Sequence, residues 1–252
     1  MFGQNKIVCI AGKNQCSIDF LKYISSKISK DNIVVLPNKN DRSVDNWQPS
    51  LRKYALKNKY KIMNISNLYK IKNLIFISIE YENLINVDKF LSKELFNFHF
   101  SLLPKFRGCH TNFFQIYNGE KYSGVTLHKI DNGIDTGHVI DKIKFKININ
   151  TNAYDNYFNL MKNSFNLLKK NFKNILQNKY NSRKQQINNG SYFSKKSVDY
   201  KKMKIFNIDK IDHITFRQIK AFIFPPFQLP IINNKTVLNI KYYKKKIKIY
   251  YD

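Results

Sequence analysis

The sequence has no run of about 18 consecutive apolar residues, the length that a membrane-spanning helix requires. Its beginning, MFGQNKIVCIAGK, also lacks the long apolar block and the small-residue cleavage site of a secretory signal peptide. Both absences predict a soluble, cytoplasmic protein with no membrane partner. The sequence shows no internal repeat either.

Cysteine is scarce, with only Cys9, Cys16 and Cys109. These three form no C-x-x-C pair and leave one over after pairing, which argues against a disulfide framework or a zinc site and favours reduced thiols. A metal-dependent hydrolase is a further alternative, because the chain has several histidines. They show no usual ligand spacing with acidic partners, so the sequence predicts no metal. The histidines considered are His99, His110, His128 and His138.

Acidic residues are few, with 17 Asp and Glu against 44 Lys and Arg, a formal net charge of +27. Such an excess ordinarily indicates a polyanionic partner such as nucleic acid. The excess is almost all Lys, however, and it accompanies abundant Asn, Ile, Tyr and Phe, whose codons are rich in A and T. Composition drift in an AT-rich genome therefore explains the charge without a binding surface, and we favour that explanation. A nucleic-acid partner remains the alternative.

The chain of 252 residues is long enough for one sizeable domain with an appendage, or for two small domains. Its first half alternates short apolar runs with amphipathic stretches. Strands separated by short helices favour an α/β fold with a Rossmann-like, mainly parallel sheet. Ligands of such sheets collect at the carboxyl ends of the strands. Strands are predicted over residues 6–12, 32–37, 60–65 and 73–79, and helices over 17–29 and 50–58.

The second half contains a helix over 111–120 that ends at Gly119, and two alternating strands around the Asp-Asn-Gly turn within 123–147. Apolar residues then recur at helical spacing over 153–180, which predicts a long amphipathic helix. Near Asn181 the pattern becomes polar. We therefore predict a catalytic domain over 1–180 and, over 181–252, a linker, a short helix and a small β-rich segment. Because a small hairpin rarely stands alone, this segment could pair two copies in a homodimer.

One stretch, FNFHFSLLPKFRGCHTN, places Asn97 and His99 two residues apart, so in an extended chain they share a face. Asp135 follows in HKIDNGIDTGHVI, after enough chain to return beside His99. A carboxylate near an imidazole fixes its tautomer and raises its basicity. An amide can donate hydrogen bonds to an oxygen that gains negative charge. Together the three groups suit acyl transfer to an amine.

The stretch NFHFSLLPKFRG…GVTLHKIDNGIDTG resembles the signature of the formyltransferases that use 10-formyltetrahydrofolate. In that signature Asn-x-His-x-Ser-Leu-Leu-Pro precedes a distant Asp-Thr-Gly. The resemblance implies that Asn97 donates to the oxyanion, that His99 is the general base, and that Asp135 tunes His99 and the proton-relay water. It also implies a cis Leu103–Pro104 bond.

By the same resemblance the co-substrate is N10-formyltetrahydrofolate, and its pterin lies between two loops, Ile79–Ile85 and Ile130–Asp135. Backbone N–H and C=O groups of such loops can bind the amide edge of the pterin, so the identity of the loop side chains is only weakly constrained. The candidate cofactor-binding residues are Glu80, Tyr81, Asn83, Leu84, Ile130, Asp131 and Gly133.

Two known acceptors of the family fit poorly. The purine enzyme follows its first strand with a Gly-x-Gly-Ser-Asn phosphate loop, whereas this chain has AGKNQCS, without the second glycine. The segment after Asn181 is too short for the complete basic barrel of the methionyl-tRNA enzyme. The segments DNWQPSLRKYA, HFSLLPKFRGCHTN and FRQIKAFIFPPFQLPIIN look most like the sugar-nucleotide N-formyltransferases of O-antigen and related surface-glycan pathways.

That resemblance implies a dTDP-linked amino-dideoxy sugar as the acceptor, with dTDP-4-amino-4,6-dideoxyglucose preferred. A 3-amino sugar and methionyl-tRNA are the alternatives. A nucleotide sugar needs an aromatic ring against its base and cations or backbone amides against its diphosphate. Core packing explains each candidate aromatic equally well. The candidates are Trp47, Arg107, Phe222, Phe224 and Phe227, and more weakly Lys105, Tyr192 and Arg217.

Overall fold

The computed structural model describes residues 6–244 and 246–252 and divides the chain into two compact units. The first unit consists of the described residues up to His99, with Val125–Ile143 and Lys162–Ile187. The second unit consists of Phe100–Gly124, Lys144–Met161 and Asn188–Asp252. The two units thus alternate along the sequence, and a domain boundary near residue 181 stays a prediction.

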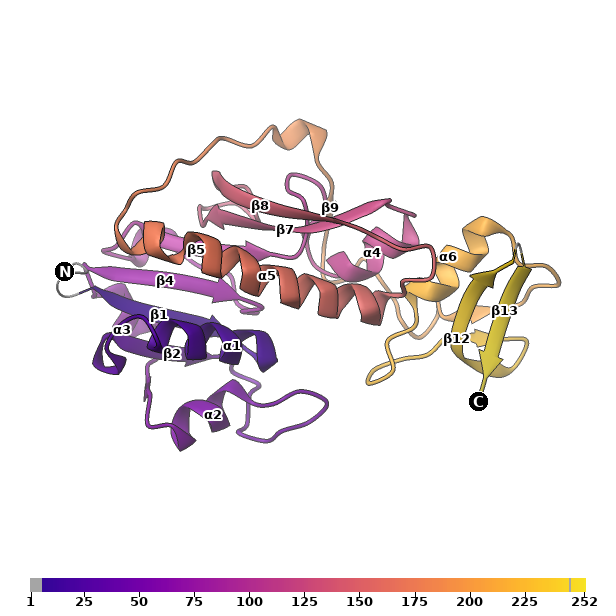
Figure 1. Ribbon diagram of the computed structural model, residues 1–252, viewed down its shortest axis with the longest axis horizontal. Coiled ribbons are helices and arrows are strands. Elements are labelled where there is room, and N and C mark those ends of the chain that lie inside the picture. The colour runs from indigo at the N-terminus through magenta and orange to yellow at the C-terminus, as the bar shows by residue number, and fades with distance from the viewer. Residues whose placement is uncertain (1–5, 245) are drawn as a thin grey trace. The chain divides into compact units, whose positions relative to one another are not determined.

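A seven-stranded sheet has the order β3-β2-β1-β4-β5-β7-β8. Strands β1 to β5 pair in parallel, and β7 runs antiparallel to β5. Figure 1 shows β1, β2 and β4 side by side in the first unit. The mainly parallel α/β sheet expected from the sequence is confirmed. The strands are β1 (Ile7–Gly12), β2 (Ile33–Pro37), β3 (Lys61–Ile62), β4 (Leu74–Ile79), β5 (Glu94–His99), β7 (Tyr122–Lys129) and β8 (Val139–Lys146).

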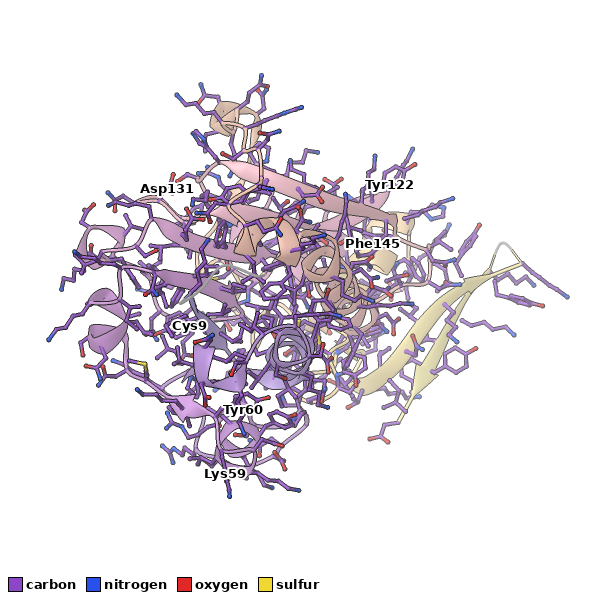
Figure 2. The ribbon with its side chains drawn as sticks, turned by 60° about the vertical axis from the view of Figure 1, so that its left-hand side comes forward. Cys9, Lys59, Tyr60, Tyr122, Asp131 and Phe145 are labelled. Carbon is purple, nitrogen blue, oxygen red and sulfur yellow. The ribbon has the colours of Figure 1, made fainter. Side chains whose placement is uncertain are left out.

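The central strands of the first unit are apolar along nearly their whole length because both of their faces are covered. Every residue of β2 and β4 is buried. Cys9 on β1 lies among surrounding side chains in the interior, whereas Lys59 lies at the edge (Figure 2). Burial raises the pKa of the Cys9 thiol far above its ordinary value, so this thiol is a packing group and not a nucleophile.

In the described part of the first unit, the α-helices that lie wholly within it are α1 (Asn14–Ser25), α2 (Leu51–Lys57) and α3 (Ile65–Tyr69), and two short 3-10 helices cover Lys30–Asn32 and Val87–Lys89. Helix α3 occupies part of the stretch for which the alternation of residues 60–65 predicted a strand, and that prediction is wrong beyond Ile62. The reason is a helix cap: the Asn64 side chain accepts a hydrogen bond from the Asn67 amide over 3.0 Å and so starts the helix.

The long helix α5 (Ala153–Leu176) confirms the amphipathic pattern, although it ends before residue 180. Leu167, Leu168 and Phe172 are buried in its C-terminal half, and Phe172 contacts Tyr23 of α1 with ring centroids 6.0 Å apart. The residues after this helix, up to Ile187, remain in the first unit. Residues 181–187, which read as a polar linker, therefore belong with the strands that carry the predicted catalytic residues.

The second unit contains α4, α6 and a four-stranded sheet of order β10-β11-β12-β13. Val237 and Ile240 of β12 pack with Phe216 and Ile219 of α6. The hairpin of β12 and β13 therefore has partners within its own chain, and a homodimer stays a prediction. The elements are β6 (Arg107–Gly108), α4 (Thr111–Tyr117), β9 (Tyr192–Phe193), β10 (Ile205–Phe206), α6 (His213–Ala221), β11 (Ile231–Ile232), β12 (Lys235–Tyr243) and β13 (Lys246–Tyr251).

Two further details of the second unit were foreseen in the sequence. The Leu103–Pro104 peptide bond is cis. Gly119 lies just past the end of α4 with φ +72°, the left-handed conformation in which glycine follows a helix.

Candidate functional site

Strand β5 delivers Asn97 and His99 to one face of the sheet. Phe98, which lies between them, points to the opposite face, where its ring contacts Phe20 of α1 at a centroid distance of 4.8 Å. Phe20 and Phe98 are almost completely buried, so their packing holds the strand in place on that side. The alternation of β5 therefore fixes the amide and the imidazole beside each other at the carboxyl end of the strand.

The Asp135 carboxylate lies against both of these side chains. Asn97 Nδ2 donates a hydrogen bond to Asp135 Oδ1 over 3.2 Å, and His99 Nδ1 lies 3.4 Å from Asp135 Oδ2. The side chains of His99 and Asp135 are 8% and 12% exposed, so water screens their interaction little. A carboxylate at Nδ1 keeps the ring proton on that nitrogen, which makes Nε2 the basic one. The structure brings the three groups together, and their catalytic roles stay predictions.

A fourth polar side chain, His128, joins this cluster and was missed as a site residue. It faces Asn97 across the antiparallel pair of β5 and β7, with Asn97 Nδ2 and His128 Nε2 3.2 Å apart. His128 Nδ1 lies 2.7 Å from the carbonyl oxygen of Lys129, to which it donates. With Nδ1 donating, Nε2 accepts from Asn97, and it also lies 3.5 Å from Asp135 Oδ1. In the sequence His128 lies seven positions before Asp135. The pairing of its strand with β5 brings it opposite Asn97.

The loop that carries Asp135 has a defined backbone. Asp131, labelled in Figure 2, lies in this loop two residues after the end of β7. The Asp131 carboxylate accepts hydrogen bonds from the amide of Gly133 over 3.2 Å and from Thr136 Oγ1 over 2.7 Å. A Cβ on Gly137 would lie 1.8 Å from the carbonyl oxygen of Lys129, so only glycine fits there. The predicted Asp-Asn-Gly turn is thus part of a wider, braced loop.

The loop after β4 is braced by a buried residue that the sequence did not single out. Asn38 is fully buried, donates to the carbonyl oxygen of Glu80 over 3.0 Å and accepts from the amide of Glu82 over 3.3 Å. Glu80 has φ +56°, a left-handed conformation that non-glycine residues rarely adopt. Leu84 is 81% exposed at the tip of the loop. A fixed backbone with an apolar tip suits the recognition of a flat ligand.

The two predicted cofactor loops come together in the first unit. Tyr81 and Ile130 pack against the same buried cluster. Asn132 Nδ2 also donates to Asp88 Oδ2 over 3.4 Å, which links the Asp135 loop to the segment that follows Ile85. Asn83, by contrast, has a buried Nδ2 without a hydrogen-bond partner among the described residues, and burial raises the pKa of the Tyr81 phenol.

The predicted substrate residues fall into both units. Trp47 lies partly buried in the first unit, in a loop that Asp41 holds by accepting hydrogen bonds from Ser50 Oγ over 2.5 Å and from the Arg52 amide over 2.9 Å. Arg107, Phe222, Phe224 and Phe227 lie in the second unit.

The aromatic candidates of the second unit differ in exposure. Phe222 is fully buried, with its ring centroid 4.9 Å from that of Phe113, so it fills the core and presents no ring face. Phe224 is 7% exposed and stacks with Phe227, which is 67% exposed, at a centroid distance of 5.6 Å. Phe227 is therefore the one of these three rings that a base could reach.

No group of three or more His, Cys, Asp and Glu side chains in residues 6–244 and 246–252 is arranged to hold a metal ion. Across the same residues, no helix combines the length and the apolar character needed to cross a membrane. The cytoplasmic location stays a prediction.

Residues 5–164 match the family model of the formyl transferases, and the match contains Asn97, His99 and Asp135. The chain belongs to the formyl transferase family. The family resemblance proposed from the sequence motif is thereby confirmed, and with it the α/β fold.

Solved formyltransferase structures match nearly the whole chain. A sugar 3N-formyltransferase, WlaRD, crystallised with dTDP and 5-N-formyltetrahydrofolate, is 44% identical over 96% of this chain and 88% of its own, with a TM-score of 0.90. The N-formyltransferase from Helicobacter canadensis, in complex with folinic acid and dTDP-3-aminofucose, is 39% identical over 97% and 95% of the two chains, with a TM-score of 0.88.

Curated relatives match more narrowly. The bifunctional polymyxin resistance protein ArnA of Wigglesworthia glossinidia brevipalpis is 38% identical over 109 residues, which cover 39% of this chain and 17% of that protein. The methionyl-tRNA formyltransferase of Clostridium tetani is 35% identical over 124 residues, 44% of this chain and 40% of the relative. The chain thus spans less than half the length of these two curated relatives.

Proposed function

We propose that this chain is an N-formyltransferase that moves the formyl group of N10-formyltetrahydrofolate to the amine of a dTDP-linked amino-dideoxy sugar, in O-antigen or other surface-glycan synthesis. The observation that carries the proposal is the placement of the Asp135 carboxylate, 3.2 Å from the amide of Asn97 and 3.4 Å from the imidazole of His99. These three groups are the ones that formyl transfer to an amine requires.

In the proposed reaction the neutral amine of the sugar attacks the formyl carbon, and a new C–N bond forms. His99 Nε2 accepts the proton that the amine loses, because Asp135 holds the ring proton on Nδ1. Asn97 donates to the oxygen that becomes negative through the N–H that also faces His128 Nε2, a shared hydrogen bond that leaves the amide in place. When the bond from the formyl carbon to N10 breaks, N10 takes up the proton and tetrahydrofolate leaves.

The two braced loops would hold the folate. The pterin would bind the backbone of the loop that Asn38 fixes at Glu80 and of the loop that Asp131 fixes at Gly133. The bicyclic amide edge of a pterin carries adjacent donors and acceptors, which backbone N–H and C=O groups of rigid loops can match. Leu84 and Ile134 are exposed apolar side chains of these loops and would cover the ring.

For the acceptor we propose a 3-amino-3,6-dideoxy sugar linked to dTDP. The two neighbours with high identity are a sugar 3N-formyltransferase and an enzyme bound to dTDP-3-aminofucose. The 4-N-formyltransferase from Francisella tularensis is 22% identical and supports the fold alone. The preference for the fourth carbon that the sequence suggested is unconfirmed, and dTDP-4-amino-4,6-dideoxyglucose becomes the competing acceptor.

The test is a formyl-transfer assay with N10-formyltetrahydrofolate and three acceptors: a dTDP-3-amino sugar, a dTDP-4-amino sugar and methionyl-tRNA. Mass spectrometry of each acceptor should show one added formyl group on the 3-amino sugar, at a kcat/KM at least about tenfold above that of the 4-amino sugar. Faster formylation of the 4-amino sugar would reverse the choice of acceptor. Formylation of tRNA alone would overturn the sugar-nucleotide proposal.

A further inference from the structure

Gln185 is a buried residue whose side-chain amide donates hydrogen bonds to the loop that carries Asp135. It is 7% exposed, and its Nε2 donates to two backbone carbonyl oxygens, that of Asp135 over 3.0 Å and that of Gly137 over 2.7 Å. The two carbonyls lie on either side of Thr136. One amide therefore clamps both ends of the tripeptide that begins with the carboxylate residue.

The chemistry of the clamp requires an amide donor. Turning the amide round would place Oε1 against two carbonyl oxygens, which repel it, so the NH₂ group must face the loop. Gln185 Oε1 itself is buried without a hydrogen-bond partner in the described residues, so the donor end alone secures this side chain. Neither Glu nor Met at this position can supply the two N–H groups.

The segment that carries Gln185 is itself anchored at two earlier positions. Tyr180 donates from its hydroxyl to Glu94 Oε2 over 2.5 Å, at the start of β5. Arg183 and Val139 exchange backbone hydrogen bonds of 2.8 Å each, which join the segment to the start of β8. Gln185 thus reaches the loop from backbone held by β5 and β8, the strands that flank β7 in the sheet.

Asp135 needs such support because its backbone is strained. Its φ is +54°, a conformation in which the Cβ of a non-glycine residue crowds its own backbone. This conformation directs its carboxylate to Asn97 and His99. If the Asp135 carbonyl turned away from Gln185, the peptide units on either side of Asp135 would rotate and relax the strain. The Asp135 carboxylate would move with them.

We propose that Gln185 is a positioning residue that holds the Asp135 carboxylate against His99. Its kinetic consequences rest on the proposed function, whereas its effect on His99 does not. Without the clamp, Asp135 relaxes away from Nδ1, and the protonated imidazole loses its stabilising neighbour. His128 shares this carboxylate: its Nε2 lies 3.5 Å from Asp135 Oδ1, and its ring centroid lies 6.4 Å from that of His99, so its titration is followed beside that of His99.

The test compares wild type, Gln185→Met and Gln186→Met by ¹⁵N NMR of the histidine rings, with the His99 signals assigned from their absence in His99→Asn. Gln186 is the adjacent, exposed glutamine and serves as the matched control. In Gln185→Met, the titration of His99 should move to lower pH, and the proton should occupy Nδ1 in a smaller fraction of rings. A His99 titration unchanged from wild type in a folded Gln185→Met protein would overturn the proposal, whatever the enzyme's substrate proves to be.

The same variants are then assayed for formyl transfer. For Gln185→Met we expect a kcat lower by about 10- to 100-fold with KM values near those of wild type, because the variant misaligns Asp135 and His99 and leaves the substrate contacts unchanged. The acid limb of the pH–rate profile should move to lower pH, as the NMR titration does. An inactive wild type would count against the proposed function only, whereas an active enzyme with unchanged kcat and pH profile in Gln185→Met would count against the clamp only.

A measurement on wild type decides the case if Gln185→Met fails to fold. Both Nε2 protons of Gln185 are engaged with backbone carbonyls, so they should exchange with solvent at least about tenfold more slowly than those of the exposed Gln177. Equal exchange rates for the two side-chain amides would contradict the clamp.

Discussion

Asn97 and His128 stand opposite each other on two antiparallel strands, and the amide nitrogen of one lies 3.2 Å from the ring nitrogen of the other. His128 is 2% exposed, and its second ring nitrogen donates to its neighbour's carbonyl, so its plane is fixed. The Asn97 amide is therefore oriented by His128 as well as by Asp135. An oxyanion donor works only when its direction is set before the charge develops.

Replacing His128 should therefore weaken catalysis without removing a catalytic group. We expect His128→Phe to lower kcat by about tenfold, because the Asn97 amide can then rotate, while substrate KM values stay near those of wild type. Steady-state kinetics with His138→Phe as the control test this, since His138 is exposed. Equal kcat values for wild type and His128→Phe would show that Asp135 alone orients Asn97.

Removing any of the three central groups should cost far more. Asn97→Ala, His99→Ala and Asp135→Ala should each fold normally and lose about 10²- to 10⁴-fold in kcat. Thermal unfolding of each variant checks the fold, and the formyl-transfer assay checks turnover. Turnover close to that of wild type in His99→Ala would remove His99 as the assigned base.

Much of this site could be predicted because its signals are local. Asn97 and His99 share a face of β5 for the elementary reason that a strand has a period of two, and Asp135 completes a motif of specific order. His128 and Gln185 could not be predicted in the same way. Their roles come from strand pairing and from a turn of chain after α5, which bring together residues far apart in the sequence.

The fold, too, was predictable where its signals are local and not where contacts between distant residues decide. The buried runs of β1, β2 and β4 are long and apolar, so their strands were clear from the sequence. The stretch after residue 62 also alternates, but the capping hydrogen bond of Asn64 outweighs that pattern and starts α3. Residues 181–187 are mostly polar and predicted a linker, and the sequence pattern held no sign of the contacts that Arg183 makes with Val139 and Gln185 with the Asp135 loop.

Glycine at position 137 should be indispensable for the geometry of the Asp135 loop. A Cβ there would lie 1.8 Å from a backbone carbonyl oxygen, which cannot move without disturbing β7. We expect Gly137→Ala to lower the free energy of unfolding by about 1–3 kcal/mol and to reduce kcat. In Gly133→Ala the Cβ would meet the side chain of Thr136 and not the backbone, so this variant should lose less stability than Gly137→Ala. Equal losses in the two variants would contradict this reading of the loop.

Lys220 should make stability depend on pH. It is 5% exposed, donates from Nζ to the carbonyl oxygens of Ile149 and Thr151, and burial lowers its pKa from 10.5 to about 8. Between these values the unfolded chain binds the proton and the folded chain does not, so the free energy of unfolding should rise with pH from about 8 to about 10.5. The size of the effect is on the order of 3 kcal/mol.

Urea unfolding from pH 7 to 11 would measure this effect as the difference between wild type and Lys220→Met. The variant lacks the titrating amine, so its curve should miss the rise. Lys210→Met, at an exposed lysine of the same unit, should follow wild type. Parallel curves for wild type and Lys220→Met would show that the buried amine keeps its proton.

The measurement that tests the central claim most directly is a double-mutant cycle on formyl transfer with His99→Ala, Asp135→Ala and the double variant. If the carboxylate acts through the imidazole, removing both should cost far less in kcat/KM than the product of the two single losses, because only the contact of the carboxylate with Asn97 then remains to be lost. Losses that multiply in the double variant would mean that the two side chains work separately, and would contradict the account.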